Sequence, residues 1–393
     1  MINKGWCESM KTFKRIIISL LSLFAGLFVV LLGIFIVAIV SNVNIIEDNI
    51  KFQEEHLEYL ETEYYKNYTP KKESDLADFD LEKAIEDGVK LNEIAVLGTH
   101  NSYQSLATAE TRFAMNIIDA ITLKKAGLDT FDFQMDTLTE QLEMGIRNVE
   151  IDIETLDKDD KIEFKVTHNS FIDNASSAYD FTKALQEMKI WSDNNPGHIP
   201  VYIIIEPKSF VIEINGMKKF SLDYAKELEK VIVNELGDSL LTPKDMLRDY
   251  ASFKEMREND DWLTLKEAQG KIIVLLHDCD VTESYIALDE SIKTQKMFPM
   301  LRYDDRNESY TSFILENDPW NADSRKAESI DECKLIIRTR ADKYPNYSAE
   351  RYEITENCGS QIITTDFPEK VDGNEGNVFS FNGKKVKLLG NRN

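Results

Sequence analysis

The sequence predicts an α/β protein, a TIM-type (β/α)8 barrel that follows one N-terminal transmembrane helix. Three observations support this fold class. Apolar, β-branched segments alternate with helix-like segments from about residue 76 onward, several of the strand segments end in polar or charged residues, and one long uncharged run lies near the N-terminus. Parallel barrels gather their functional side chains at the carboxyl ends of the strands, so the same pattern also predicts where a site should lie.

Seven strand candidates have the composition of parallel strands that are covered on both faces. They are residues 94–99, 148–153, 164–167, 201–206, 272–277, 335–340 and 361–366. An eighth strand is expected within 238–250, where LLTPKDML is ambiguous. Strands in this number, separated by helices, favour a closed barrel. A doubly wound open sheet is the alternative, because periodicity does not show closure.

Helix candidates alternate with these strands. They are residues 134–144, 178–194, 221–236 and 348–357. The second candidate has apolar residues at helical spacing and stops at the turn sequence Asn-Pro-Gly. The final segment, GNEGNVFSFNGKKVKLLGNRN, is expected to be an irregular or hairpin-like tail.

The N-terminal segment predicts a membrane anchor. Residues 16–40 form an uncharged run that is longer than a signal peptide requires and long enough to cross a bilayer. Basic residues precede the run and acidic residues follow it, so the N-terminus is expected in the cytoplasm. We therefore expect a cytoplasmic tail at 1–15, a signal-anchor at 16–40, a stalk at 41–75 and an extracellular catalytic domain at 76–393. A cleaved signal, which would leave a secreted domain, is the alternative.

Charge and cysteine content narrow the functional class. The net charge of −24 makes nucleic acid an unsuitable partner and disfavours electrostatic attachment to anionic lipid. Three cysteines are expected outside the membrane, Cys279, Cys333 and Cys358, and their spacing does not match a zinc motif. A disulfide between Cys333 and Cys358 and free thiols are both open.

Carboxylates lie at two of the strand ends. Glu150 and Asp152, in NVEIDIE, are two residues apart and therefore share one face of a strand. In a partly dry pocket they would repel each other, and a bound cation would remove that cost. Hard carboxylate oxygens favour Ca²⁺ or Mg²⁺. Glu206, in VYIIIEPKS, is expected to complete the acidic set, and Asn101 to add a neutral oxygen ligand.

Two histidines occupy matching positions in GTHNSY and VTHNSF. His100 and His168 each follow a short apolar strand and precede Asn-Ser. Histidine carries protons near neutral pH, so a pair can serve as base and acid in one displacement. Lys208 is expected to hold a phosphate oxygen as a point charge. Arg340 and Asp366 end later strands and are candidates to line the substrate pocket.

The ordered set of motifs resembles the phosphatidylinositol-specific phospholipase C superfamily, and within it the calcium-dependent branch of bacterial secreted enzymes. The resemblance covers roughly residues 90–370. It runs through GTHNSY, the Glu150-x-Asp152 strand, THNSF, IIIEPKS, LTPKDML, LKEAQGKIIVLL, RTRAD and ITTDFP. It implies a (β/α)8 barrel that is often imperfectly closed. It also implies two catalytic histidines, His100 and His168, and one Ca²⁺ held by Asn101, Glu150, Asp152 and Glu206.

The resemblance further implies an activity at a membrane surface, the calcium-dependent cleavage of phosphatidylinositol or a related inositol phospholipid. The inositol 2-hydroxyl would lose its proton to His100 or to a carboxylate and attack phosphorus. His168 would protonate the departing diacylglycerol oxygen. The products would be diacylglycerol and inositol 1,2-cyclic phosphate, which water opens to inositol phosphate.

Two other functions are alternatives. A glycerophosphodiester phosphodiesterase is a related barrel that also uses a Glu-x-Asp strand, a later histidine and a Glu-x-Lys strand end. Its first motif normally reads His-Arg, whereas this chain has His-Asn at positions 100 and 101. A non-catalytic surface module that binds lipid or glycan would be expected to lack the acid/base residues, and both histidines are present.

Overall fold

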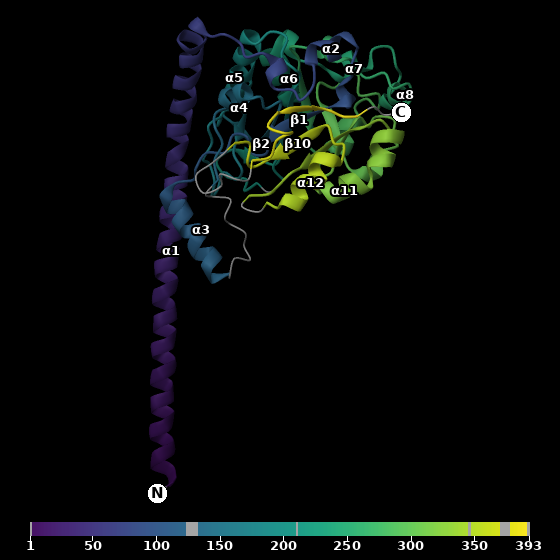
Figure 1. The fold of residues 1–393 in the computed structure, drawn as a ribbon. Coiled ribbons are helices and arrows are strands. Elements are labelled where there is room, and N and C mark those ends of the chain that lie inside the picture. Colours follow the sequence, from purple (N-terminus) through teal and green to yellow (C-terminus); the bar gives the residue numbers. More distant parts are fainter. Residues whose placement is uncertain (1, 123–132, 210, 345–346, 370–377, 391–393) are drawn as a thin grey trace.

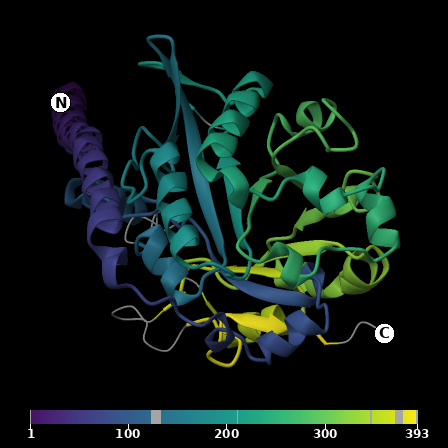
Figure 2. The same cartoon turned by 90° about the horizontal axis from the view of Figure 1, so that it is seen from above.

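Eight parallel strands close into a barrel that is surrounded by helices (Figures 1 and 2). The computed structural model describes residues 2–122, 133–209, 211–344, 347–369 and 378–390. The barrel strands are β1 Ile94–Thr99, β2 Asn148–Lys158, β4 Val201–Pro207, β6 Ile272–Leu276, β7 Phe298–Leu301, β8 Phe313–Leu315, β9 Ile336–Arg340 and β10 Ile362–Thr365. The predicted (β/α)8 barrel is confirmed.

The seam between β1 and β2 closes the barrel. Neighbouring strands follow the order β1-β10-β9-β8-β7-β6-β4-β2, and Gly98 of β1 pairs with Asn148 of β2. A Cβ atom at Gly98 would lie 2.5 Å from Oδ1 of Asn148, closer than atoms can pack. A glycine is therefore required where the two strands meet.

Two strand predictions differ from the structure. The segment predicted at 164–167 lies at the end of β3 Lys161–Val166, which pairs antiparallel with β2 in a hairpin and is not a barrel strand. The eighth strand is not within 238–250, because that segment forms a 3₁₀ turn and the helix α7 Pro243–Leu247. The two barrel strands that were not predicted are β7 and β8. Their four and three residues are too few to give a recognisable pattern.

The four predicted helices are present as α4 Leu138–Met144, α5 Phe181–Asn194, α6 Leu222–Leu236 and α12 Ala349–Asn357. Polar side chains fix their starts: the Thr137 hydroxyl accepts a hydrogen bond from the Glu140 amide, and the Asp180 carboxylate accepts one from the Lys183 amide. The other helices are α2 Leu81–Glu86, α3 Ala109–Ile121, α8 Phe253–Glu258, α9 Leu265–Ala268, α10 Thr282–Ile286 and α11 Pro319–Ser324.

Alternation along the strands separates the core into two layers. Ile203 and Ile205 of β4 point outward and pack with the buried apolar residues of α5 and α6. Tyr202 and Ile204 belong to the other layer, together with aromatic residues of β7 and β8. Glu206 continues this second row at the carboxyl end of β4. The barrel interior is thus apolar at its base and acidic at its mouth.

The described part of the predicted tail contains one short strand. β11 Val386–Leu388 pairs antiparallel with β1, and the short β5 Met217–Lys218 pairs with β2. Phe379 and Phe381 are buried, whereas residues 373–377 of the expected tail lie outside the described residues. In the described part of the chain Cys279, Cys333 and Cys358 are free thiols.

The segment predicted as a stalk is packed against the barrel. Helix α1 runs without interruption over Ile2–Thr62, so the apolar run and the residues after it form one rod (Figure 1). Its buried side chains recur at helical spacing on one face: Ala38, Asn42, Asn49, Gln53 and Leu60. Residues 42–60 therefore do not lift the barrel away from the anchor; they join the two. The segment 16–40 is apolar and long enough to be a candidate membrane span.

Side-chain hydrogen bonds fasten α1 to the domain. The Gln53 amide donates to the Asp180 carbonyl at 3.0 Å and accepts from the Asp180 amide at 2.9 Å. Asn49 donates to the Asn174 carbonyl at 2.6 Å, and Asn42 accepts from the Asn174 amide at 2.7 Å. Buried hydrogen bonds of this kind are costly to break, because a buried donor or acceptor is then left with neither a protein partner nor water.

Replacing Gln53 with alanine should lower the free energy of unfolding by about 2–4 kcal/mol, because two buried backbone groups of Asp180 lose their partners. Thermal denaturation of the full chain in detergent micelles measures this change. Glu54→Ala is the matched control, since its contact with Lys183 is a largely exposed ion pair worth less than about 1 kcal/mol. Equal effects of the two substitutions would contradict the packing of α1.

Candidate active site

Three carboxylates meet inside the mouth of the barrel. Glu150 and Asp152 come from β2, and Glu206 comes from β4, where it lies opposite Asp152 in the parallel register. Each offers a ligand atom, and these atoms all lie within 4.8 Å of one another. Glu150 and Asp152 are fully buried and Glu206 is half-buried. The structure thus brings together the three acidic residues that were predicted as metal ligands.

Two cations partly neutralise this cluster. Lys208 Nζ lies 2.6 Å from Asp152 Oδ2 and 3.0 Å from Glu206 Oε1, and the buried Arg338 guanidinium is paired with Glu150 Oε2. Burial opposes the ionisation of Glu206, but Lys208 and His277 outweigh it and lower its pKa to about 2. No local sequence pattern indicates that Arg338 pairs with Glu150, because the two residues are 188 positions apart.

Asp152 has a buried oxygen that a bound cation would satisfy. Burial raises its pKa to about 6 in spite of Lys208. Its Oδ2 accepts a hydrogen bond from the Tyr103 hydroxyl at 2.7 Å, whereas its buried Oδ1 has no hydrogen-bond partner. A buried oxygen without a partner is destabilising, and a hard divalent cation would satisfy it. All three charged ligands of this site are carboxylates, and carboxylate oxygens are ligands that Ca²⁺ prefers.

His100 is held by a buried carboxylate. Its Nδ1 lies 2.9 Å from Asp366 Oδ1, and Asp366 also accepts hydrogen bonds from Arg340 at 3.1 Å and from the Tyr344 amide at 2.7 Å. Burial opposes the ionisation of Asp366, but His100 and Arg340 lower its pKa to about 2. An ionised Asp366 fixes the proton of His100 on Nδ1. The other nitrogen, Nε2, faces the acidic cluster and lies 3.8 Å from Glu150.

His168 lies at the start of the loop that follows β3. Its side chain is exposed to solvent at the mouth, although nearby protein atoms reduce the hydration of the ring. The reduced hydration, together with the positive charge of Lys208, lowers the pKa of His168 to about 4. His168, His100, Asn101 and Asp366 line the same small pocket. The structure therefore places both predicted histidines and Asn101 at one opening, beside the acidic cluster.

Two residues that were not predicted, Asp173 and Gln104, also line this opening. Asp173, also in the loop after β3, lines the histidine pocket, and burial raises its pKa to about 7. Gln104 donates a 3.3 Å hydrogen bond to it. Asn101 has a positive φ of 47°, which turns the chain sharply after β1. An Asn-Ser pair at a strand end is the sequence signal of such a turn.

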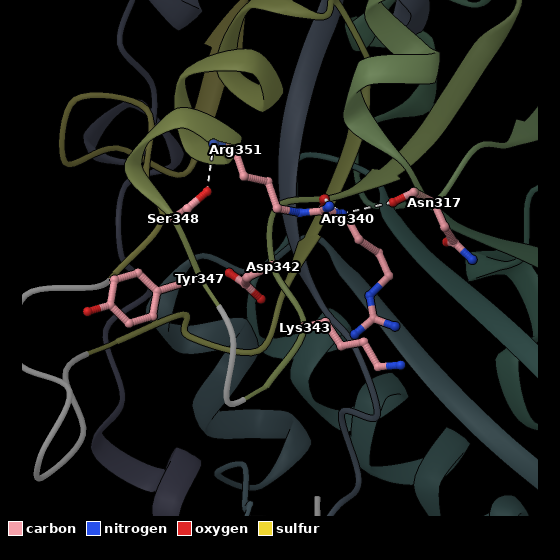
Figure 3. Close-up of a pocket in the computed structure, with 7 residues that line it drawn as sticks. All are labelled: Asn317, Arg340, Asp342, Lys343, Tyr347, Ser348 and Arg351. Atoms are coloured by element: carbon pink, nitrogen blue, oxygen red, sulfur yellow. Dashed lines mark hydrogen bonds between the residues drawn. The ribbon is translucent and has the colours of Figure 1, made fainter. Parts of the chain in front are cut away.

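A second cavity adjoins Arg340. It is lined by Asn317, Arg340, Asp342, Lys343, Tyr347, Ser348 and Arg351 (Figure 3). The side chains of Arg340 and Lys343 extend in the same direction, whereas the Arg351 guanidinium is held by the Asn317 and Arg340 carbonyls at 3.1 and 2.9 Å. Arg340 thus separates the histidine pocket from a cationic cavity next to it.

The other strand-end and loop histidines have different surroundings. His277 Nε2 lies 3.9 Å from Glu206 at the mouth. His198 is buried away from the site, where Nδ1 donates to the Ile199 carbonyl at 2.8 Å and Nε2 accepts from the Ser192 hydroxyl at 2.8 Å. Both nitrogens of His198 are therefore used structurally, in the neutral ring.

Lowering the pH should destabilise the fold through His198. Burial lowers its folded-state pKa from 6.5 to about 4, so the unfolded chain binds the proton first as the pH falls through this window. Stability present above pH 6.5 is then lost, by about 2 kcal/mol between pH 7.5 and pH 5. Melting curves of the wild type and His198→Gln at the two pH values test this. The variant should show a smaller loss; an identical loss would contradict the assignment.

A family model described as phosphoinositide phospholipase C, Ca²⁺-dependent, matches residues 89–160 and 154–389, well over half of the chain. No curated protein matches the chain.

Several solved structures are similar to this chain. One is a calcium-dependent phosphoinositol-specific phospholipase C from a Gram-negative bacterium, Pseudomonas sp., described as an apo form and myoinositol complex; it is 16% identical, with a TM-score of 0.52 over 79% of this chain and 98% of its own. A second crystal form has a TM-score of 0.53 over 81% and 100% of the two chains, at 16% identity. A Ca²⁺-dependent phosphatidylinositol-specific phospholipase C from Streptomyces antibioticus is 16% identical and covers 71% of this chain and 95% of its own, with a TM-score of 0.48.

Proposed function

The chain belongs to the calcium-dependent phosphoinositide phospholipase C family, and we propose that it cleaves phosphatidylinositol, or a related inositol phospholipid, to diacylglycerol and inositol 1,2-cyclic phosphate. One observation supports the chemistry above all others: two imidazoles line one pocket beside a cluster of three carboxylates. A proton donor, a proton acceptor and a cation site are what an intramolecular attack on a phosphodiester requires.

The cation site consists of Glu150, Asp152 and Glu206, with Asn101 as a neutral ligand. We assign one Ca²⁺ to it, because the unpaired buried oxygen of Asp152 and the mutual approach of the three carboxylates are best satisfied by a single ion. When bound, Ca²⁺ would neutralise charge on the phosphate oxygens and lower the pKa of the inositol 2-hydroxyl.

His100 is suited to accept the proton of the 2-hydroxyl. Asp366 holds Nδ1 in its protonated form, which leaves the lone pair of Nε2 toward the acidic cluster and the substrate. Asp366 and Arg340 are positioning residues in this scheme, since they act on His100. The hydroxyl oxygen then attacks phosphorus, and Lys208 would hold one of the phosphate oxygens as its charge develops.

His168 is suited to protonate the oxygen of the departing diacylglycerol. In the free protein its pKa of about 4 leaves it neutral at pH 7. The negative charge of a bound phosphodiester raises the pKa of a neighbouring imidazole, so His168 would take up its proton together with the substrate. The P–O bond to diacylglycerol breaks as the bond to the 2-oxygen forms, which gives the cyclic phosphate; water can later open the ring.

We further propose that residues 16–40 are retained as a membrane span, with the barrel outside the cell. A cut after residue 40 would remove Ile34, Phe35 and Ala38, which pack against helix α3 of the catalytic domain. The basic residues before the span and the acidic residues after it favour the same orientation.

An activity assay of the full chain tests the proposed function. The protein is placed in detergent micelles that contain phosphatidylinositol, with millimolar calcium or with chelator. We expect release of inositol 1,2-cyclic phosphate only when calcium is present. Glycerophosphoinositol is the comparison substrate: cleavage of this compound with no action on the intact lipid would identify a glycerophosphodiester phosphodiesterase. Release of no phosphorylated product from either would reject both enzymes.

A further inference from the structure

Helix α1 passes the barrel in a defined direction. Asn42 contacts Ser170 in the loop after β3, at the mouth, and Gln53 contacts Asp180 at the start of α5. Tyr68 donates to Asn195, which ends α5 just before β4 begins at the base. The chain therefore runs from the mouth to the base as its numbers rise. The apolar run 16–40 must project beyond the mouth, as Figure 1 shows.

Helix α3 lies next to this projecting part of α1. It follows β1, and the Thr108 hydroxyl caps its first turn. Ser41 donates to Glu110 at 3.0 Å, and the Thr111 hydroxyl donates to the Ala38 carbonyl at 3.4 Å. Farther along, Ala114 and Met115 belong to a cluster with Ile34 and Phe35. The two helices are thus antiparallel, and α3 descends from the mouth toward the middle of the apolar run (Figure 1).

The opposite face of α3 is apolar and uncovered. Phe113 is 59% exposed and Ile121 is 64% exposed, among the most exposed large apolar side chains outside α1. Asn116, Ile117 and Ala120 lie between them on the same side, and the one charged residue there, Glu110, lies in the first turn, where it accepts a hydrogen bond from Ser41. An apolar helix face open to water is unfavourable, so it indicates a surface that something covers.

The level of α3 matches the edge of a bilayer. A hydrocarbon core is about 30 Å thick, and a helix rises about 1.5 Å per residue, so about 20 residues cross it. Counted from Ile16, directly after the basic Lys14 and Arg15, the core ends near Phe35. Phe35 is where α3 packs against α1. The start of α3 then lies in the head-group region and its end lies at the acyl chains.

We propose that the uncovered face of α3 inserts into the outer leaflet of the membrane that α1 spans, which seats the barrel mouth on that leaflet and makes the enzyme act on lipids of its own membrane. This proposal rests on the proposed function and on the retention of α1. The occupant is the bilayer because α3 is continuous with the span through Ile34, Phe35 and Ala38. With a net charge of −24, the protein must be held there by apolar contact and by α1.

Tryptophan fluorescence tests the insertion without any need for activity. Full-length Phe113→Trp is reconstituted in vesicles with or without brominated lipid, and its emission in excess of the wild type is measured. The matched control is Val233→Trp, at a 39% exposed apolar position near the far end of α6. We expect strong quenching of the added emission of Phe113→Trp and none for Val233→Trp. No quenching at position 113, as when α3 meets a second copy or stays in water, overturns the proposal.

Substrate presentation tests the second half of the proposal. Wild type, Phe113→Asp/Ile121→Asp and the control Val233→Asp are compared on lipid in their own vesicles, on lipid in added protein-free vesicles and on a soluble short-chain phosphatidylinositol. We expect wild type to prefer its own vesicles at least tenfold. The α3 double variant should lower the ratio of vesicle to soluble rates at least tenfold, and Val233→Asp should not.

The outcomes separate the two proposals. Cleavage of the soluble lipid without preference for the protein's own vesicles would overturn the membrane seat and leave the proposed function intact. If the soluble lipid is not cleaved at all, the proposed function fails, while the quenching result still decides whether α3 enters the bilayer.

Discussion

Alanine at position 100 or 168 should reduce turnover of phosphatidylinositol by about a thousandfold or more. General acid–base groups contribute about 10²–10⁴ each to the rate, and these two imidazoles line one pocket. His100→Ala removes the group that would accept the proton of the 2-hydroxyl, and His168→Ala removes the group that would protonate the leaving oxygen. Initial rates of cyclic phosphate release at saturating calcium measure the loss.

A matched pair of variants separates catalysis from folding. Both alanine variants should keep the wild-type circular dichroism spectrum and melting temperature to within a few degrees, because His168 is exposed and His100 is only partly buried. His198→Gln serves as the control, since it changes a histidine outside the pocket, and it should retain most activity at pH 7.5. If His168→Ala kept more than a tenth of the wild-type rate, the assignment of the acid would be wrong.

Asp366→Asn should have a smaller effect of a different kind. The asparagine leaves His100 in place but allows its proton to reside on Nε2, where the lone pair is needed. We expect about a hundredfold lower kcat, with little change in KM and an altered pH–rate profile. A loss confined to stability would instead mean that Asp366 serves only the fold.

Asp152→Asn should raise the calcium concentration that gives half-maximal activity at least tenfold, the second large effect. The substitution keeps the shape of the side chain but removes charge from the oxygen that lacks a partner in the structure. Lys208 keeps Glu206 as a counterion, so the fold should survive. Calcium titration of the reaction, together with direct calcium binding by calorimetry, measures the change.

The choice of Asp152 over Glu150 follows from Arg338. Glu150→Gln would leave the buried Arg338 without its partner, and broken buried ion pairs cost about 3–5 kcal/mol. Its effect on calcium would then be mixed with unfolding. Glu290→Gln, at an exposed acid near another cavity, is the control for general electrostatic effects. An unchanged calcium requirement in Asp152→Asn would remove Asp152 from the ligand set.

Much of the site was predictable because each residue follows a recognisable strand. The pairs Glu150 and Asp152 in β2, and Glu206 and Lys208 at the carboxyl end of β4, have the two-residue spacing of a shared face. Parallel pairing then brings the two strands together. Contacts between residues that only the closure of the barrel brings together could not be predicted from the sequence. The contact between His100 and Asp366 spans 266 residues, and no local pattern encodes it.

The errors in the fold also have physical reasons. β7 and β8 have only four and three residues, which is too short for a strand pattern to be recognised. LLTPKDML resembles a strand because it contains several leucines, but these leucines lie in a turn and in helix α7. The stalk is predicted from the composition of residues 41–75, which are rich in Glu, Lys, Tyr and Asn. Its polar stripe, with Asn42, Asn49 and Gln53 spaced seven and four residues apart, was a legible signal of a packed helix face.

Asn42 and Asn49 of α1 hydrogen-bond to the loop that carries His168, so the part of α1 beyond the membrane span also supports the reaction centre. A shortened, water-soluble enzyme intended for crystallisation should therefore begin near Ser41, so that this brace is kept. Starting at Leu76, the predicted start of the catalytic domain, would remove these contacts and expose the backbone of Asn174 and Asp180 to solvent.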